Sequence, residues 1–414
     1  MRHLVFLFTI GCGTTPAIDQ PTGQGETIVS SGAAMTGPFF AMLGTNERTC
    51  ASCHDQTAGW SITPATLQTL FETTGGMDPV FRSIDATTAP DDDVTSLDAR
   101  RVAYALLLDR GLIRVGRPLP PGEIALARIS DPYGYAGPAE LSLFRRPLPA
   151  TNLRFVGELM WDTREPALEE QAIDATTGHA QAPALADDVA QQIVEFESAL
   201  VTAQRFDDVA GDLASDGARG GAATLLGQSY EPGINDPKTG FDRDVFTLYG
   251  AWTNADPATA AGRRRRAIAR GEQIFNTHPF QIRGVAGIAN QRGTCSTCHD
   301  TPNIGSHSVP LALDLGVSDV DDDTRDLPVY RLVSSVTGQT ATTTDPGLAL
   351  TTGRWADIGK FKVPSLRGLA MRPPYFHNGR ARDLSEVVRF YDQKFDLHLS
   401  DDETSDLVAF LGAL

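Results

Sequence analysis

The sequence is poor in lysine, histidine and cysteine, and it contains no long apolar run. Its 414 residues carry 35 Lys and Arg against 52 Asp and Glu, which gives a formal net charge of −17. So acidic a chain lacks the basic surface that displaces counterions from nucleic acid, and we expect no nucleic-acid partner. No apolar stretch is long enough to cross a bilayer. The 41% of apolar residues nevertheless excludes a disordered chain, and the length predicts two or three domains.

The five cysteines do not form the pattern of a disulfide scaffold. Cys12 is a singlet, and the other four form two identical pairs, Cys50 with Cys53 and Cys295 with Cys298. A disulfide framework has an even number of cysteines at varied spacings. Here each pair belongs to a C-x-x-C-H-D segment, and the two segments lie far apart, as expected for one site per domain.

C-x-x-C-H is the attachment motif of c-type haem. Two thiols add across the vinyl groups of the macrocycle, and the adjacent histidine is directed under the iron. Two zinc sites would need further cysteines or histidines at compact spacing, which the sequence lacks. We therefore predict two covalently bound c-type haems, attached through the cysteine pairs, with His54 and His299 as proximal iron ligands.

Histidine is too scarce to close the far side of the first haem. There is none between His54 and His179. A six-coordinate haem transfers electrons, whereas an open one binds peroxide or dioxygen. The first haem is thus the predicted reactive centre.

The N-terminus has the outline of an export signal. Arg2 and His3 precede a short apolar run that ends at Gly11-Cys12, and this junction resembles a bacterial lipobox, in which the cysteine is acylated. The alternative is ordinary cleavage nearby with loss of Cys12. We expect residues 1–12 to be the signal peptide and 13–37 a polar tether. Both alternatives predict a periplasmic protein, attached to a membrane only through an N-terminal lipid.

Helical patterns dominate the remainder of the chain. Apolar residues at helical spacing predict helices at 97–110, 187–203, 263–275, 384–395 and 403–411, and no convincing alternation predicts strands. The Gly-, Asp- and Pro-rich residues 211–262 form a loop-rich connection between domains at 38–210 and 263–414. The sequence therefore predicts an all-α fold.

The chain resembles the di-haem bacterial cytochrome c peroxidase and MauG family. Beyond the two haem motifs, the resemblance rests on MWDTREPALEEQA at 160–172 and on VPSLRGLAMRPPYFHNGRARDLSEVVRFYD at 363–392. It implies two loop-rich, cytochrome c-like domains, each with one covalent haem. The N-terminal domain would be peroxidatic and the C-terminal domain would transfer electrons.

The resemblance also implies roles for residues near the first haem. Trp161 matches a tryptophan that relays electrons between the haems, and Gln171 matches a glutamine of the distal pocket. The acid–base glutamate of the family is replaced by Gln181, which cannot exchange a proton with peroxide. His179 can do so, and we predict that it takes over this role; the alternative is a hydrogen-bonded structural histidine.

Near the second haem, Tyr391 stands where peroxidases of the family carry a methionine ligand, as in the MauG-type arrangement. It is the predicted distal ligand, and its alternatives are Met371, His377 and His398. The family counterpart of His377 hydrogen-bonds around the haem edge. The family also binds calcium between the domains, through an Asn side chain and backbone carbonyls just before the P-Y-x-H motif. Arg146 occupies the matching Asn position, which speaks against calcium here.

Three functions follow from the resemblance. The first is a peroxidase that reduces hydrogen peroxide with electrons from a small cytochrome or cupredoxin. The second is a MauG-like oxidase that modifies a partner protein through high-valent haem. The third is a di-haem electron carrier without turnover.

Overall fold

The computed structural model describes residues 23–30, 35–236 and 240–414. The predicted signal peptide, Cys12 and most of the predicted tether lie outside these ranges. The α-helices are α1 Pro64–Thr74, α2 Leu97–Ala103, α3 Ala105–Arg110, α4 Leu168–Gly178, α5 Asp187–Ala199, α6 Gly221–Leu226, α7 Ala260–Thr277, α8 Ala349–Thr352, α9 Leu384–Phe395 and α10 Asp401–Gly412.

Short strands lie between these helices. They are β1 Gln24–Val29, β2 Ile113–Arg117, β3 Ile124–Ser130, β4 Leu141–Arg145, β5 Leu200–Asp207, β6 Gly211–Asp212, β7 Phe280–Ile282, β8 Gln291–Gly293, β9 Ala312–Leu313, β10 Val329–Ser334, β11 Thr340–Thr343 and β12 Phe361–Lys362. Two sheets have three strands, in the orders β1-β5-β6 and β11-β10-β3, and the remaining strands pair two by two. All these pairings are antiparallel.

The expectation of an all-α fold is wrong. Of the residues that the structure describes, helices account for 33% and strands for 16%, so the fold is mixed. Period-two alternation was not visible because β4 is buried along its whole length and the first five residues of β5 are buried as well. A strand buried on both faces shows no alternation. In addition, β3 pairs with β10 from the other half of the chain, Val329 lying opposite Ser130.

The predicted helices are found with shifted ends. The helix expected at 97–110 is interrupted at Tyr104, which separates α2 from α3. The helix expected at 187–203 ends at Ala199, and the chain continues directly into β5. The other three lie within or close to α7, α9 and α10. At α9 the predicted cap is present, since the Asp383 side chain accepts from the backbone N–H of Glu386 at 2.8 Å.

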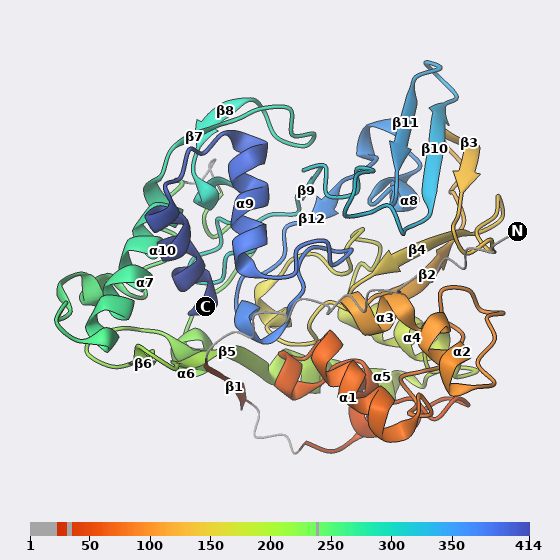
Figure 1. Ribbon diagram of the computed structural model, residues 1–414, viewed down its shortest axis with the longest axis horizontal. Helices are drawn as coiled ribbons and strands as arrows, with labels where there is room; N and C mark the ends of the chain where they lie inside the picture. Colours follow the sequence, from red (N-terminus) through yellow and green to blue (C-terminus); the bar gives the residue numbers. More distant parts are fainter. Residues whose placement is uncertain (1–22, 31–34, 237–239) are drawn as a thin grey trace, which may run out of the picture.

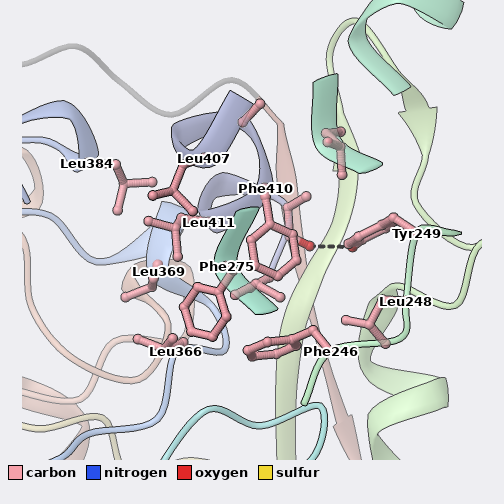
Figure 2. Packing of buried hydrophobic residues seen from close by; sticks show 14 of the residues in the cluster. Phe246, Leu248, Tyr249, Phe275, Leu366, Leu369, Leu384, Leu407, Phe410 and Leu411 are labelled. Carbon is pink, nitrogen blue, oxygen red and sulfur yellow. Dashed lines mark hydrogen bonds between the residues drawn. The ribbon is translucent and has the colours of Figure 1, made fainter. Parts of the chain in front are cut away.

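The largest apolar cluster joins the C-terminal helices. Phe275 of α7 and Phe410 of α10 pack against Phe246, and the Tyr249 hydroxyl donates to the Ala413 carbonyl at 2.6 Å (Figure 2). In Figure 1, α7, α9 and α10 lie together on one side, and the β3-β10-β11 sheet lies on the opposite side. The division of the chain into two domains at 211–262 stays a prediction.

Candidate haem-binding sites

Both C-x-x-C-H segments have the same local structure. Each cysteine pair starts on a 3₁₀ turn, Cys50–Ser52 or Cys295–Thr297, and each turn is closed by a capping box with the preceding threonine. The backbone N–H of His54 donates to the Cys50 carbonyl at 3.0 Å, and that of His299 donates to the Cys295 carbonyl at 3.1 Å. The chain therefore presents two thiols and an imidazole in one compact turn, twice.

The two histidines are held in the form that ligates iron. His54 Nδ1 donates to the Trp60 carbonyl at 2.9 Å, and His299 Nδ1 donates to the Gly305 carbonyl at 2.6 Å. A carbonyl accepts only, so Nδ1 carries the proton and Nε2 is left with its lone pair. Burial lowers the pKa of both histidines, that of His299 to about 4, which keeps the imidazoles neutral.

Each motif borders an apolar cavity. The N-terminal cavity is lined by Cys50, Cys53 and His54, and the C-terminal cavity by Cys295, Cys298 and His299. Each holds about 1580 Å³ of empty space, including its open mouth. The cavities share one wall, to which the following residues contribute: Arg146, Pro147, Leu148, Pro149, Trp161, Lys362, Pro364 and Arg372.

These cavities suit haem better than a metal ion bound by thiolates. Burial raises the pKa of Cys50 to about 12 and that of Cys53 to about 11, so these thiols stay uncharged at neutral pH. Within the described residues, no group of three or more His, Cys, Asp or Glu could hold a metal ion. In the shared wall, the Nε of Arg372 is buried without a hydrogen-bond partner, a donor suited to the carboxylates of a haem. The residues present therefore fit the group.

His179 lies at the C-terminal end of α4, along the N-terminal cavity. Its Nδ1 hydrogen-bonds Asp85 Oδ2 at 2.6 Å, and Arg48 Nη1 pairs with Asp85 Oδ1 at 2.5 Å. Burial opposes ionisation of Asp85, but His179 and Arg48 outweigh it and lower the pKa of Asp85. An ionised carboxylate thus orients the imidazole and leaves Nε2 available for proton exchange.

Sequence reasoning missed Asp85 and Arg48. Asp85 lies 94 residues from His179 in the chain, within a stretch rich in Asp and Thr where nothing distinguishes it. It is 5% exposed and Arg48 is 2% exposed. Only the fold brings the pair together beside His179.

The other residues predicted for the first haem have different positions. Gln171 of α4 lines the N-terminal cavity, two helical turns before His179. Gln181 is exposed, has a φ of 57°, and is not among the residues that line either cavity. Trp161 belongs to the shared wall, and its indole N–H donates to the Arg146 carbonyl at 2.8 Å.

Glu197 of α5 is a further residue of the N-terminal cavity that sequence reasoning missed. It is 5% exposed, its Oε2 has no hydrogen-bond partner, and burial raises its pKa to about 8. The helical spacing in the sequence could have identified it, because Glu197 lies four residues after the apolar Ile193 and therefore on the same face of the helix.

At the second haem motif, Tyr391 of α9 lines the C-terminal cavity, and its ring stacks on Phe395. His377 lines the same cavity and is 1% exposed. Its ring stacks on Phe361 with centroids 3.9 Å apart, and neither ring nitrogen has a hydrogen-bond partner. Met371 and His398 are not among the residues that line this cavity.

Comparisons with known proteins find cytochrome-c peroxidases and MauG proteins that are similar to this chain. No protein-family profile matches the chain. It is 34% identical over 158 residues to the cytochrome-c peroxidase IdrP1 of Pseudomonas sp. (strain SCT), covering 32% of this chain and 39% of that protein. The match to the methylamine utilization protein MauG of Paracoccus denitrificans is 29% identical over 190 residues and covers 45% of each chain.

Two further matches extend over most of the chain. MauG of Methylophilus methylotrophus is 26% identical over 357 residues, covering 81% of this chain and 87% of that protein. The crystal structure of a MauG-like protein associated with microbial copper homeostasis aligns with a TM-score of 0.42 and 16% identity, covering 96% and 94% of the two chains. The match to IdrP1 spans about two fifths of the length of that relative.

Proposed function

We infer that the chain belongs to the di-haem cytochrome c peroxidase and MauG family of haem proteins, and from that premise we propose that it is a peroxidase with two covalently attached haems. The proposed reaction is the two-electron, two-proton reduction of hydrogen peroxide to two waters. The electrons come from a small redox protein. One observation carries the proposal, namely the His179–Asp85 pair at the cavity that His54 borders.

The cysteine pairs would hold the haems, and His54 and His299 would ligate their irons. A bound haem supplies the iron centre at which the O–O bond is reduced. The chain supplies the proton transfer: Nε2 of His179 takes a proton from one peroxide oxygen and returns it to the other as that oxygen leaves as water. Asp85 balances the charge of the imidazolium during the transfer, which supports a general acid–base role.

Electrons would pass between the two cavities through the shared wall. Trp161 lies in this wall and is 6.2 Å, ring centroid to centroid, from His377 of the C-terminal cavity. Its indole N–H is bonded to the Arg146 carbonyl, which fixes the ring plane. Trp161 is therefore the relay residue of the proposal, and the electron donor would dock near the C-terminal cavity.

A second function is favoured by Tyr391. A phenolate ligand stabilises oxidised iron, which suits a MauG-like oxidase that removes electrons from a residue of a partner protein. The position of Tyr391 in the C-terminal cavity supports this alternative. Under either function we propose export to the periplasm, with a lipid on Cys12 as the membrane attachment. Among the described residues, no helix is long and apolar enough to cross a membrane.

The decisive experiment adds hydrogen peroxide and reduced cytochrome c to the purified haem protein and compares His179→Asn with His398→Asn. His398 is exposed and lines neither cavity, so it is a matched control. We expect His179→Asn to lower kcat/KM by about 10²–10⁴-fold, the usual contribution of a positioned acid–base group. The control should retain the wild-type value.

Undiminished turnover in His179→Asn would contradict the acid–base role. A wild-type protein whose haem spectrum responds to peroxide but which oxidises cytochrome c poorly would favour the MauG-like function. A haem spectrum that does not respond to peroxide would favour the third function, an electron carrier without turnover.

A further inference from the structure

Arg146 is a buried cation in the wall between the two cavities. It follows β4 directly, it is 5% exposed, and it lines both cavities. A buried charge is costly unless charged or polar partners compensate it. The neighbouring Arg145 has two such partners, since it pairs with Asp162 at 2.7 Å and Asp345 at 2.6 Å.

Arg146 has no carboxylate partner within the described residues; backbone carbonyls surround it instead. Nη1 donates to the Arg110 carbonyl at 2.7 Å, and Nη2 donates to the carbonyls of Ile62 at 2.6 Å and Arg372 at 3.3 Å. Carbonyl oxygens that surround a cation are typical ligands of a hard metal ion. Here three of them bind the two terminal nitrogens of the guanidinium.

The backbone around Gly111 is shaped to admit this guanidinium. Gly111 ends α3 with a φ of 62°, and a Cβ on it would collide with Nη1 of Arg146. The absence of a side chain therefore serves both the left-handed helix cap and the space that the guanidinium fills.

Arg146 connects three parts of the molecule. Ile62 is two residues from Trp60, whose carbonyl holds the His54 imidazole. Arg372 lies two residues before the P-Y-F-H segment of the other cavity and His377 ends that segment, and the backbone N–H of Arg146 donates to the His377 carbonyl at 2.7 Å. The Arg146 carbonyl accepts the indole N–H of Trp161.

A calcium ion does not fit this wall. The resemblance implies calcium held by an Asn side chain and by carbonyls just before the P-Y-x-H motif. In this chain Arg146 replaces the Asn, and Arg372, whose carbonyl Arg146 binds, lies two residues before that motif. A divalent cation would meet a fixed positive charge that already occupies the carbonyl oxygens.

We propose that the guanidinium of Arg146 takes the place of a calcium ion in this wall. It binds the carbonyl oxygens of a calcium-type site and so fixes the positions of Trp161 and of both cavities relative to one another without a divalent ion. Arg146 is thus a positioning residue, and its role does not depend on which of the family's reactions the protein performs.

The test measures calcium binding by calorimetry, and Tm with EGTA or with excess calcium, on the full haem protein. The wild-type protein should bind no calcium in the wall, and its Tm should be the same in both conditions. Arg146→Asn offers an amide oxygen beside the three carbonyls, so it should bind one calcium ion per chain. Its Tm should fall in EGTA and recover with calcium.

Three control variants distinguish the effect of the Arg146 charge from the effect of its volume and from the effect of losing any buried arginine. Arg146→Lys keeps a charge and should stay insensitive to calcium with a Tm near wild type, whereas Arg146→Met keeps the volume and should lose stability in both conditions. Arg367→Asn removes a buried arginine whose guanidinium, within the described ranges, hydrogen-bonds only the Gly221 carbonyl, at 3.4 Å, and it should show no calcium response.

Two results would overturn the proposal. One is a wild-type Tm that falls in EGTA. The other is an Arg146→Asn protein whose stability calcium does not restore, whether it is folded or unfolded. Equal stability of Arg146→Met and Arg146→Lys would reduce Arg146 to a packing residue and would also contradict the proposal.

Discussion

Single side chains at the N-terminal cavity differ in how their charge is compensated. Asp85 is buried, but an imidazole and a guanidinium hold it ionised. Glu197 is equally buried, but burial is the sole cause acting on it, and its pKa rises to about 8. At neutral pH the buried Asp85, which pairs with two residues of the cavity wall, is therefore ionised, whereas Glu197 in that wall keeps its proton, and only Asp85 hydrogen-bonds His179.

Glu197 should make the protein less stable as the pH rises. Below its ordinary pKa of 4.5, Glu197 is protonated whether the chain is folded or not, so it has no effect on stability. Between about 4.5 and 8 the unfolded chain loses the proton and the native chain keeps it, so the free energy of unfolding falls. Glu197→Gln should abolish this fall and gain about 2–4 kcal/mol at pH 8, with no gain at pH 4.

Thermal or urea unfolding across this pH range measures the effect. Glu195→Gln is the matched control, because Glu195 lies on the exposed face of the same helix, α5. If Glu197→Gln and the wild-type protein gave parallel stability profiles from pH 4 to 8, the buried carboxyl would not have the raised pKa described here.

Among the secondary-structure elements, α9 brings its residues to the C-terminal cavity by ordinary helical spacing. Leu384, Val387, Val388, Tyr391 and Phe395 recur every three or four residues, and all of them line that cavity. The helix starts at a predictable cap, so the position of Tyr391 is already encoded in the local sequence. What the helix packs against is decided elsewhere in the chain.

Tyr391→Phe should therefore leave the helix in place and change only the group it offers to the cavity. We expect a Tm close to wild type, an altered absorption spectrum of the oxidised haem protein, and a higher reduction potential of the second haem, because a phenolate favours oxidised iron. Tyr375→Phe is the control in the same cavity. Its hydroxyl donates to the Leu369 carbonyl at 3.0 Å, so its loss should affect stability and not potential. A methionine–iron charge-transfer band retained in Tyr391→Phe would contradict the assignment.

For the molecule as a whole, the two halves of the chain are joined by buried polar contacts as well as by the β3–β10 pairing. Arg145 of β4 lies between Asp162 and Asp345, which come from opposite halves, and all three side chains are 3% exposed or less. Despite burial, the charges of Arg145 and Arg164 hold the pKa of Asp162 far below its usual range. Asp162 thus contributes stability above the ordinary pKa of a carboxyl, and this contribution is lost as the pH falls toward its depressed pKa.

Arg145→Gln should destabilise the whole protein, because it leaves the buried Asp345 without its arginine partner and leaves Asp162 with Arg164 alone. We expect a loss of about 3–5 kcal/mol in urea unfolding, the usual cost of removing one partner from a buried ion pair. Arg154→Gln, on the exposed side of a neighbouring 3₁₀ turn, should cost less than about 0.5 kcal/mol. Equal effects of the two variants would show that the buried cation does not join the halves.

The sequence by itself determined the two C-x-x-C-H motifs, from which haem attachment is predicted, and most of the helices. The thiols and the imidazole of each motif lie within one turn, so their geometry is local, and an amphipathic helix such as α9 is set by its own residues. The strands were not predictable, because they are short, buried on both faces or paired across the chain.

Only the tertiary structure decided which polar groups meet. Asp85 reaches His179, and Arg146 reaches the carbonyls of Ile62, Arg110 and Arg372, across separations that no local pattern reveals. Gln181 shows the converse, since a position matched by sequence is exposed and does not line the cavity. The physical reason for the Asp85 and Arg146 contacts is the same: a buried charge is tolerated only where the folded chain supplies partners, and those partners come from distant segments.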